Sequence, residues 1–145
     1  MGKPKVMVAL RDAAYVESLV TLACQMANGM DAEVTALHVV EVPQPTPLEA
    51  RDEVIDHPGK ELLVKAQHVA ERFSRHVVTD LLRAREAGEA IVGEAQERGV
   101  DLLVMGHHKP HPHALRETLL GSTVQYVAHH APCRVIVQIP PPSHR

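Results

Sequence analysis

The last third of the chain, residues 100–139, reads VDLLVMGHHKPHPHALRETLLGSTVQYVAHHAPCRVIVQI and decides the fold class. It opens on a short apolar run, residues 102–105, which is typical of a strand covered on both faces. A polar stretch rich in histidine and proline follows, and residues 122–130 then carry a helical pattern that ends before Pro132. A second apolar run, residues 133–139, closes the segment. This strand–helix–strand order predicts two parallel strands joined by a helix.

The same alternation extends through the first hundred residues. Apolar runs predict strands at residues 5–10, 33–40 and 76–82, and helical spacing predicts helices at residues 14–30, 59–75 and 88–98. Asn28 and Gly29 are expected to end the first helix. Residues 41–58 are rich in proline and are expected to form a long loop. The complete order predicts an α/β domain with a single five-stranded parallel sheet and helices on both faces.

Composition limits the class of protein further. The 145 residues are enough for one domain, which we expect to span residues 1–139, followed by a proline-rich tail at residues 140–145. Apolar residues make up 45% of the chain and aromatic residues 2%, so the core must be aliphatic. A net charge of -3 argues against a nucleic-acid partner, since such surfaces need clustered basic charge or stacking aromatic side chains.

The chain carries no signal for export or membrane insertion. No apolar run approaches the ~20 residues that a membrane-spanning helix needs, and the N-terminus leads directly into a strand. Cys24 and Cys133 are the two cysteines, and their spacing matches no metal motif. We therefore expect a cytoplasmic protein, without membrane insertion, whose two thiols are reduced core residues.

Polar and glycine residues follow two strands that we expect to be neighbours. Ligands of open parallel sheets bind at the carboxyl ends of the strands, where the strand order reverses. Asp12 follows the first strand, Gly106 follows the fourth, and Gly121, Ser122 and Thr123 open the last helix. A helix N-terminus offers unpaired N–H groups to a phosphate, and a glycine allows close approach. The alternative is that Asp12 and Ser122 or Thr123 only cap helices, and that Gly106 is an ordinary turn residue.

These segments resemble the universal stress protein family over nearly the whole chain. The resemblance is carried by residues 100–108, 119–123 and 130–137, together with the first two strands. It implies the adenine nucleotide alpha hydrolase-like fold, with the strand order 3-2-1-4-5. In that order the first and fourth strands are neighbours.

The resemblance also implies a nucleotide site. ATP-binding members carry a glycine motif whose first glycine matches Gly106 and whose final pair matches Gly121 and Ser122, while Lys109 stands at the middle glycine position. A lysine there restricts close backbone approach, but its ammonium attracts phosphate. The implied ligand is ATP, ADP or AMP, not covalently bound, with AMP or ADP favoured. The implied nucleotide-binding residues are Leu10, Asp12, Val39, Met105, Gly106, His107, His108, Lys109, Gly121, Ser122 and Thr123, of which Leu10, Asp12 and Val39 lie near the adenine.

Four histidines, His107, His108, His111 and His113, lie close together in the loop before the last helix. Neutral imidazoles bind zinc, copper or nickel. However, no cysteine or carboxylate cluster accompanies them, and their spacing is not a helical pair. We expect no metal site, and these four residues would be the ligands if one formed. The alternatives are a solvated loop that gains charge near about pH 6 and phosphate contacts by His107 and His108.

The expected function is a nucleotide-binding stress-response or regulatory signalling module. An apolar edge strand is a template for pairing, and family members often pair through the last strand, so we expect a homodimer through the strand from Arg134 to Ile139. No Walker A, GxSxG or HExxH pattern occurs, so we expect no enzyme, with weak intrinsic ATPase activity at most. The alternatives are a nucleotide-free interaction dimer and a cytoplasmic regulatory domain of a membrane transporter.

Overall fold

The computed structural model describes residues 2–49, 52–107 and 121–139. Its sheet is parallel throughout and has the order β3-β2-β1-β4-β5, which confirms the predicted fold class and strand order. The elements in chain order are β1 (Lys5–Leu10), η1 (Ala13–Tyr15), α1 (Val16–Met30), β2 (Glu33–Glu41), α2 (Glu53–Glu71), β3 (Val78–Ala84), α3 (Ala87–Arg98), β4 (Leu102–Gly106), α4 (Ser122–His130) and β5 (Arg134–Gln138).

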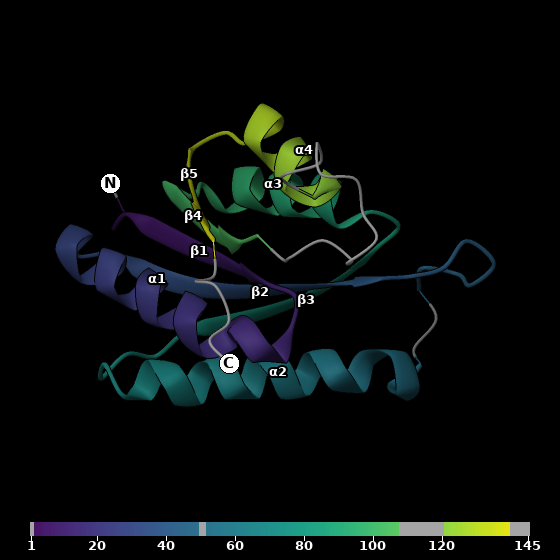
Figure 1. Cartoon of the computed structure of the whole chain (residues 1–145), viewed down its shortest axis with the longest axis horizontal. Helices are drawn as coiled ribbons and strands as arrows, with labels where there is room; N and C mark the ends of the chain where they lie inside the picture. Colours follow the sequence, from purple (N-terminus) through teal and green to yellow (C-terminus); the bar gives the residue numbers. More distant parts are fainter. Residues whose placement is uncertain (1, 50–51, 108–120, 140–145) are drawn as a thin grey trace, which may run out of the picture.

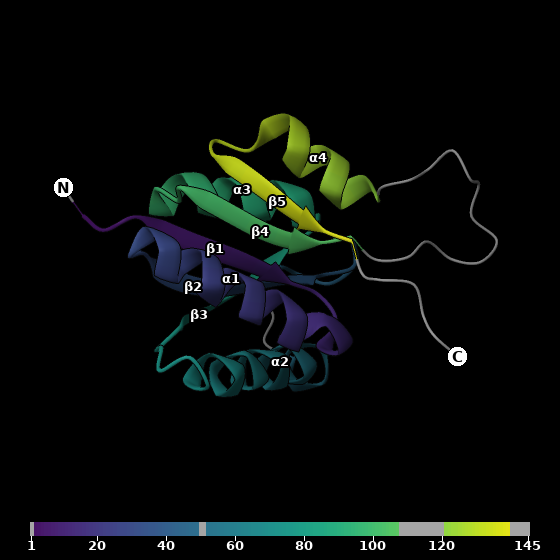
Figure 2. The same cartoon turned by 60° about the vertical axis from the view of Figure 1, so that its left-hand side comes forward.

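The molecule has three layers, with α1 and α2 on one face of the sheet and α3 and α4 on the other (Figures 1 and 2). Successive side chains of a strand point to opposite faces, so each central strand contributes to two cores. Val8 and Val104 belong to the core under α1 and α2, whereas Met7 and Leu103 belong to the core under α3 and α4. Both cores are aliphatic, as the composition requires.

Helix α2 begins at Glu53, so the predicted loop at residues 41–58 was too long. Asp52 caps the helix by accepting a hydrogen bond from the backbone N–H of Val54 at 3.0 Å. Pro58 lies inside the helix, where the N–H that it lacks would have bonded to the carbonyl of Val54. Proline is a strong signal for a loop in a sequence, and here an effective cap and the packing of the later helix outweigh it.

Helix α1 begins at Val16, after the 3-10 turn η1, and it runs through Asn28 and Gly29 rather than ending there. The residue that ends it is Asp31, which adopts the left-handed conformation with φ 53°. Aspartate is one of the few residues other than glycine that tolerates this conformation. The predicted end of the helix at residue 30 is confirmed, but Asp31 ends it rather than Asn28 and Gly29.

The next connection also differs from the prediction. Helix α2 ends at Glu71 because Ser74 takes a left-handed conformation with φ 55° and Arg75 donates from its backbone N–H to the carbonyl of Ala70 at 3.1 Å. The third strand is consequently displaced along the chain and spans Val78–Ala84. The last strand, at Arg134–Gln138, is slightly shorter than predicted.

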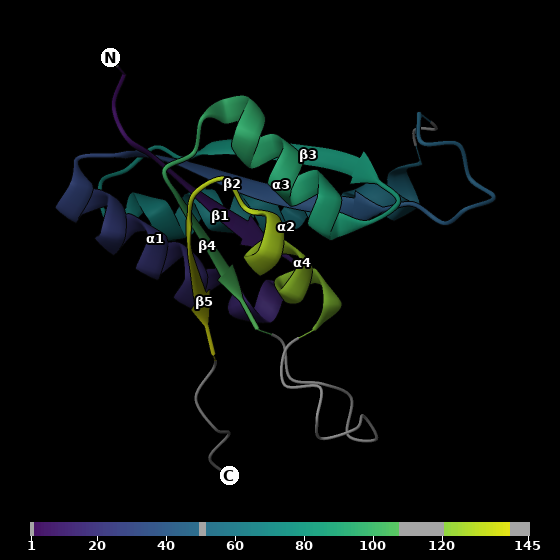
Figure 3. The ribbon, with the colours of Figure 1, turned by 90° about the horizontal axis from the view of Figure 1, so that it is seen from above.

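The carboxyl ends of the strands determine where a ligand has access. Figure 3 looks onto the layer of α3 and α4, with the strands of the sheet beneath it. Because all strands are parallel, their carboxyl ends lie along the same side of the sheet. Helices α2, α3 and α4 begin near these carboxyl ends. Within the part of the chain that the structure describes, no helix is both long and apolar enough to span a bilayer.

Candidate functional site

A cavity of about 470 Å³ opens at the carboxyl ends of β1, β2 and β4. The strand order reverses there. From β1 the sheet grows through β2 and β3 on one side, and the chain then crosses to the other side of β1 to form β4 and β5. This is where open parallel sheets bind ligands, and the volume is typical of small-molecule sites. The first turns of α2, α3 and α4 complete the walls.

Most of the predicted site residues meet around this cavity. Those in its lining are Leu10, Val39, Met105, Gly106, Gly121, Ser122 and Thr123. Asp12 and His107 are described by the structure but are not part of the lining. The other predicted residues, His108 and Lys109, lie outside the described residues.

The charged residue that follows β1 into the cavity is Arg11 and not Asp12. Asp12 is exposed, and its carbonyl accepts a hydrogen bond from the backbone N–H of Tyr15 at 3.1 Å where η1 begins. Consecutive residues of an extended chain point in opposite directions, so Arg11 and Asp12 do not both face the same space. The sequence analysis chose Asp12 because a carboxylate suits a ribose, but it did not apply this alternation.

Gly106 is the last residue of β4, one residue beyond the predicted strand, so the alternative that it is an ordinary turn residue is wrong. A Cβ atom at this position would lie 3.1 Å from Cδ1 of Leu19 in α1, and the packing of α1 explains the glycine. His107 continues the pairing of β4 with β5 by donating from its backbone N–H to the carbonyl of Gln138 at 2.9 Å. Its side chain is buried, and its Nδ1 atom has no hydrogen-bond partner within residues 2–49, 52–107 and 121–139.

The N-terminus of α4 opens on the cavity. Gly121 is the capping residue and has no side chain, and no side-chain cap of the first turn occurs among the described residues, contrary to the alternative that Ser122 or Thr123 caps the helix. The first hydrogen bond of the helix runs from the N–H of Gln125 to the carbonyl of Gly121, at 3.0 Å. The N–H groups of Ser122, Thr123 and Val124 are thus left without a helical partner. The first turn contains no acidic residue, so its positive dipole end is not neutralised there.

Gly121 is not required by its backbone conformation. Its φ of -68° and ψ of 165° are open to any residue, and no heavy atom among the described residues lies within 4 Å of the position of a Cβ. What a glycine provides here is room above the helix N-terminus. A side chain at residue 121 would occupy the space in front of the N–H groups of the first turn of α4.

The opposite wall holds two residues that the sequence analysis did not select, His38 and Gly59. The Nδ1 atom of His38 lies 2.9 Å from the carbonyl oxygen of Leu10. A carbonyl only accepts, so Nδ1 carries the proton of the neutral ring. A Cβ on Gly59 would lie 2.6 Å from Cδ2 of His38, which makes glycine necessary for the close approach of α2 to β2. In the sequence, His38 stands among the apolar residues of its strand, and this polar exception could have marked it as a candidate site residue.

Glu41, at the end of β2, is another lining residue that sequence reasoning missed. Its Oε2 atom accepts a hydrogen bond from the backbone N–H of Ala87 at 2.8 Å, so it caps α3 from a distant part of the chain. This places a carboxylate at the positive end of the helix dipole, where its charge is compensated. Of the two helices that begin at the cavity on this face, α3 is therefore capped by a distant side chain, whereas no described side chain caps α4.

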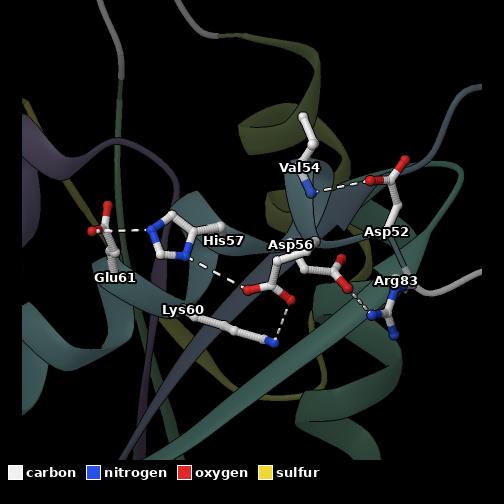
Figure 4. Close-up of polar contacts among 8 residues, drawn as sticks. Asp52, Val54, Asp56, His57, Lys60, Glu61 and Arg83 are labelled. Carbon is white, nitrogen blue, oxygen red and sulfur yellow. Dashed lines mark hydrogen bonds and ion pairs between the residues drawn. The ribbon is translucent and has the colours of Figure 1, made fainter.

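A buried ion pair fixes the beginning of α2 beside the cavity (Figure 4). Asp56 is only 3% exposed, and its carboxylate pairs with the guanidinium of Arg83 on β3. The contacts around it are exposed: Glu53 pairs with Lys60 at 3.1 Å and lies 3.6 Å from His57. Because the neighbouring Ile55, Pro58 and Gly59 line the cavity, the buried pair holds one of its walls in place.

The structure offers no thiolate or metal cluster among the residues it describes. Burial raises the pKa of the Cys24 thiol and of the Cys133 thiol, so both stay protonated near neutral pH. No three His, Cys, Asp or Glu side chains within the described ranges are placed to share a metal ion. Of the four histidines considered as ligands, only His107 is described, and His108, His111 and His113 fall outside those ranges.

The sheet order and the layers of helices are those of the solved universal stress protein structures, which have the adenine nucleotide alpha hydrolase-like fold. A sequence model of the universal stress protein family matches residues 4–138. The chain belongs to the universal stress protein family.

Individual relatives agree with this assignment. A universal stress protein of Methanocaldococcus jannaschii is 34% identical over 121 residues, which are 79% of this chain and 69% of that protein. The universal stress protein of Archaeoglobus fulgidus in complex with dAMP superposes with a TM-score of 0.69 at 22% identity, covering 94% of this chain and 97% of that one. A universal stress protein in complex with cAMP gives 0.69 at 20% identity, with 96% and 98% covered.

Proposed function

We propose that the protein binds an adenine nucleotide in the cavity at the carboxyl edge of its sheet, and that it acts as a nucleotide-responsive stress or signalling module in the cytoplasm. The observation that carries the proposal is the N-terminus of α4, which faces the cavity at Gly121 and has neither a side-chain cap nor an obstructing atom among the described residues. A helix end of this kind favours a phosphate. The solved family structures that hold dAMP and cAMP support an adenine nucleotide as the ligand class.

The two halves of the cavity suit the two ends of such a ligand. Val39, Ile91 and Met105 give the side toward α3 an apolar surface, on which a base would lie. The side toward α4 offers N–H groups and the hydroxyl groups of Ser122 and Thr123, which would hold the 5′-phosphate. AMP and ADP each have a base for the apolar half and a 5′-phosphate group for the half toward α4. In ATP, the further phosphates would also lie toward the N-terminus of α4.

Binding rather than catalysis is the role we propose for this site. The one carboxylate in the described lining, Glu41, is bonded to the N–H of Ala87, so it is not placed as a general base. The thiols of Cys24 and Cys133 are protonated and are not part of the lining. We expect ATP hydrolysis at most at a slow rate.

Calorimetric titration with AMP, ADP and ATP tests the proposal. The matched variants are Gly121→Leu, which fills the approach to α4, and Gly93→Leu, which adds the same side chain at an exposed position of α3 with open space around it. We expect saturable binding to the wild type and to Gly93→Leu, and affinity at least about tenfold weaker for Gly121→Leu, since direct access to the charged phosphate is lost. Heats equal to dilution at millimolar nucleotide, or equal binding by both variants, would contradict the proposal.

A further inference from the structure

The described lining of the cavity contains two fully charged side chains, Arg11 and Glu41, and they differ in their state. Glu41 is already engaged by the N–H of Ala87 at 2.8 Å. Arg11 is exposed at the cavity, and its guanidinium makes no ion pair or hydrogen bond within the described part of the chain. The cavity thus combines an unpaired guanidinium with the uncapped, positive end of α4, and it holds no free negative charge among the described residues.

The strand register shows where Arg11 lies relative to the two ends of a ligand. Leu10 pairs with His38 of β2, and Ala9 pairs with Met105 of β4. Arg11 therefore extends β1 between the end of β2 near Val39 and the end of β4. The base half of the cavity lies toward β2, and the phosphate half lies toward β4 and α4. On the proposed function, on which this step rests, the ribose lies between those halves, in front of Arg11.

The chemistry of a guanidinium then indicates what the ribose carries. In α/β proteins that bind dinucleotides, a carboxylate recognises the free ribose hydroxyl, whereas a nearby arginine accommodates a phosphate on the ribose. A guanidinium binds a phosphate through two parallel, charge-assisted hydrogen bonds, and a hydroxyl lacks the charge that strengthens such bonds. We infer that Arg11 selects adenine nucleotides that carry a second phosphate, on the 2′ or 3′ hydroxyl of the ribose, in addition to the 5′-phosphate.

The test compares four ligands in calorimetry at physiological salt: AMP, ADP, adenosine 2′,5′-bisphosphate and adenosine 3′,5′-bisphosphate. ADP has as many phosphates as the bisphosphates, but both are on the 5′ side. We expect one of the bisphosphates to bind roughly tenfold or more tightly than AMP and ADP. Arg11→Ala should abolish this advantage by weakening that bisphosphate roughly tenfold more than it weakens AMP. Arg11→Lys should retain part of the advantage, because an ammonium keeps the charge but not the paired geometry.

Arg72→Ala is the matched control. It removes the same charge from an exposed arginine at the far end of α2 from the cavity, and it should leave the preference unchanged. Two results would overturn the inference while leaving the proposed function intact. In the first, the bisphosphates bind no more tightly than AMP. In the second, Arg11→Ala weakens ADP and the bisphosphates equally, which would place Arg11 on the 5′-phosphate chain. If no adenine nucleotide binds at millimolar concentration, both the inference and the proposed function fail.

Discussion

At the scale of single residues, Gly59 of α2 lies so close to His38 of β2 that no side chain fits between them. The ring of His38 is held by the 2.9 Å contact from its Nδ1 to the carbonyl of Leu10, so it does not move away without losing that hydrogen bond. Both residues line the cavity, and the contact therefore couples the stability of the fold to the shape of the site.

Gly59→Ala should consequently destabilise the protein. A Cβ would lie 2.6 Å from Cδ2 of His38, and relieving such an overlap in a packed wall costs about 1–3 kcal/mol. Gly93→Ala is the control, because it is also inside a helix but has open space around it, and it should stabilise by about 0.5–1 kcal/mol. Urea denaturation followed by circular dichroism measures both. Equal changes in the two variants would show that the contact with His38 is not the cause.

The individual residues also show where sequence reasoning reached its limit. The position of Gly121, Ser122 and Thr123 in the cavity lining was predictable, because three adjacent residues at the start of a helix suffice to indicate a helix N-terminus. The choice between Arg11 and Asp12 depends on which way an extended chain points once it leaves the sheet, and a one-residue error reverses the answer. The role of Gly59 depends on a residue from another strand, and no pattern within α2 indicates it.

At the level of helices and strands, the ion pair between Asp56 and Arg83 connects the first turns of α2 to the edge strand β3. Asp56→Ala should leave the guanidinium of Arg83 without its partner in a largely buried position, and it should cost about 3 kcal/mol of unfolding free energy. The comparison is Glu17→Ala, which breaks the ion pair of Glu17 with Arg72, whose side chains are both 60% exposed, and which should cost less than about 1 kcal/mol. If both variants lost the same stability, burial would not be what makes the first pair important.

A second cluster joins β3 to α3 and makes stability depend on pH. Arg98 donates from Nε to the carboxylates of Asp80 at 3.1 Å and Glu94 at 2.7 Å. Burial, together with the hydrogen bond and the charge of Glu94, raises the pKa of Asp80 from 3.8 to about 6 despite the nearby Arg98. The pKa of Glu94 is lowered, chiefly by its hydrogen bond with Asp80. The fold thus favours a protonated Asp80, and the pair shares one proton.

The sign of the effect follows from the raised pKa of Asp80. The contribution of Asp80 to the free energy of unfolding is fully present at pH values below the ordinary pKa of 3.8. It is lost as the pH rises toward and through the raised pKa of about 6. In Asp80→Asn the amide replaces the protonated carboxyl group and does not ionise. The stability of Asp80→Asn relative to the wild type should therefore increase from pH 4 to pH 7, in denaturant titrations at several pH values. A constant difference would contradict the assignment, with Glu97→Gln, an exposed site in the same helix, as the control for losing one carboxylate.

The elements were largely predictable as types, and less so at their ends. Short apolar runs separated by helical spacing identified all five strands and four helices that the structure describes. The beginning of α2 was missed because Pro58 suggests a loop, whereas Asp52 and a buried ion pair with a distant strand favour a helix. The ends of α1 and α2 depend on left-handed Asp31 and Ser74, which are weaker signals than the glycine at the end of α3.

At the scale of the whole molecule, β5 is an edge strand that pairs only with β4 among the described strands. Ile139, directly after it, is 66% exposed. We expect two copies to associate through this edge, since an apolar edge is a pairing template. Light scattering should give twice the mass of one chain for the wild type and the mass of one chain for Ile139→Lys. Val54→Lys, at an 85% exposed valine of α2, should remain dimeric. A monomeric wild type would contradict this expectation.

The central claim is that a nucleotide occupies the cavity between the ends of β1, β2 and β4, with its phosphate on α4. Amide chemical shifts recorded by NMR during titration with AMP test this claim most directly. We expect the largest changes on Val39, Gly106 and the first turn of α4, and we expect them to saturate together. Absence of any change at millimolar AMP, or changes concentrated away from this edge of the sheet, would contradict it.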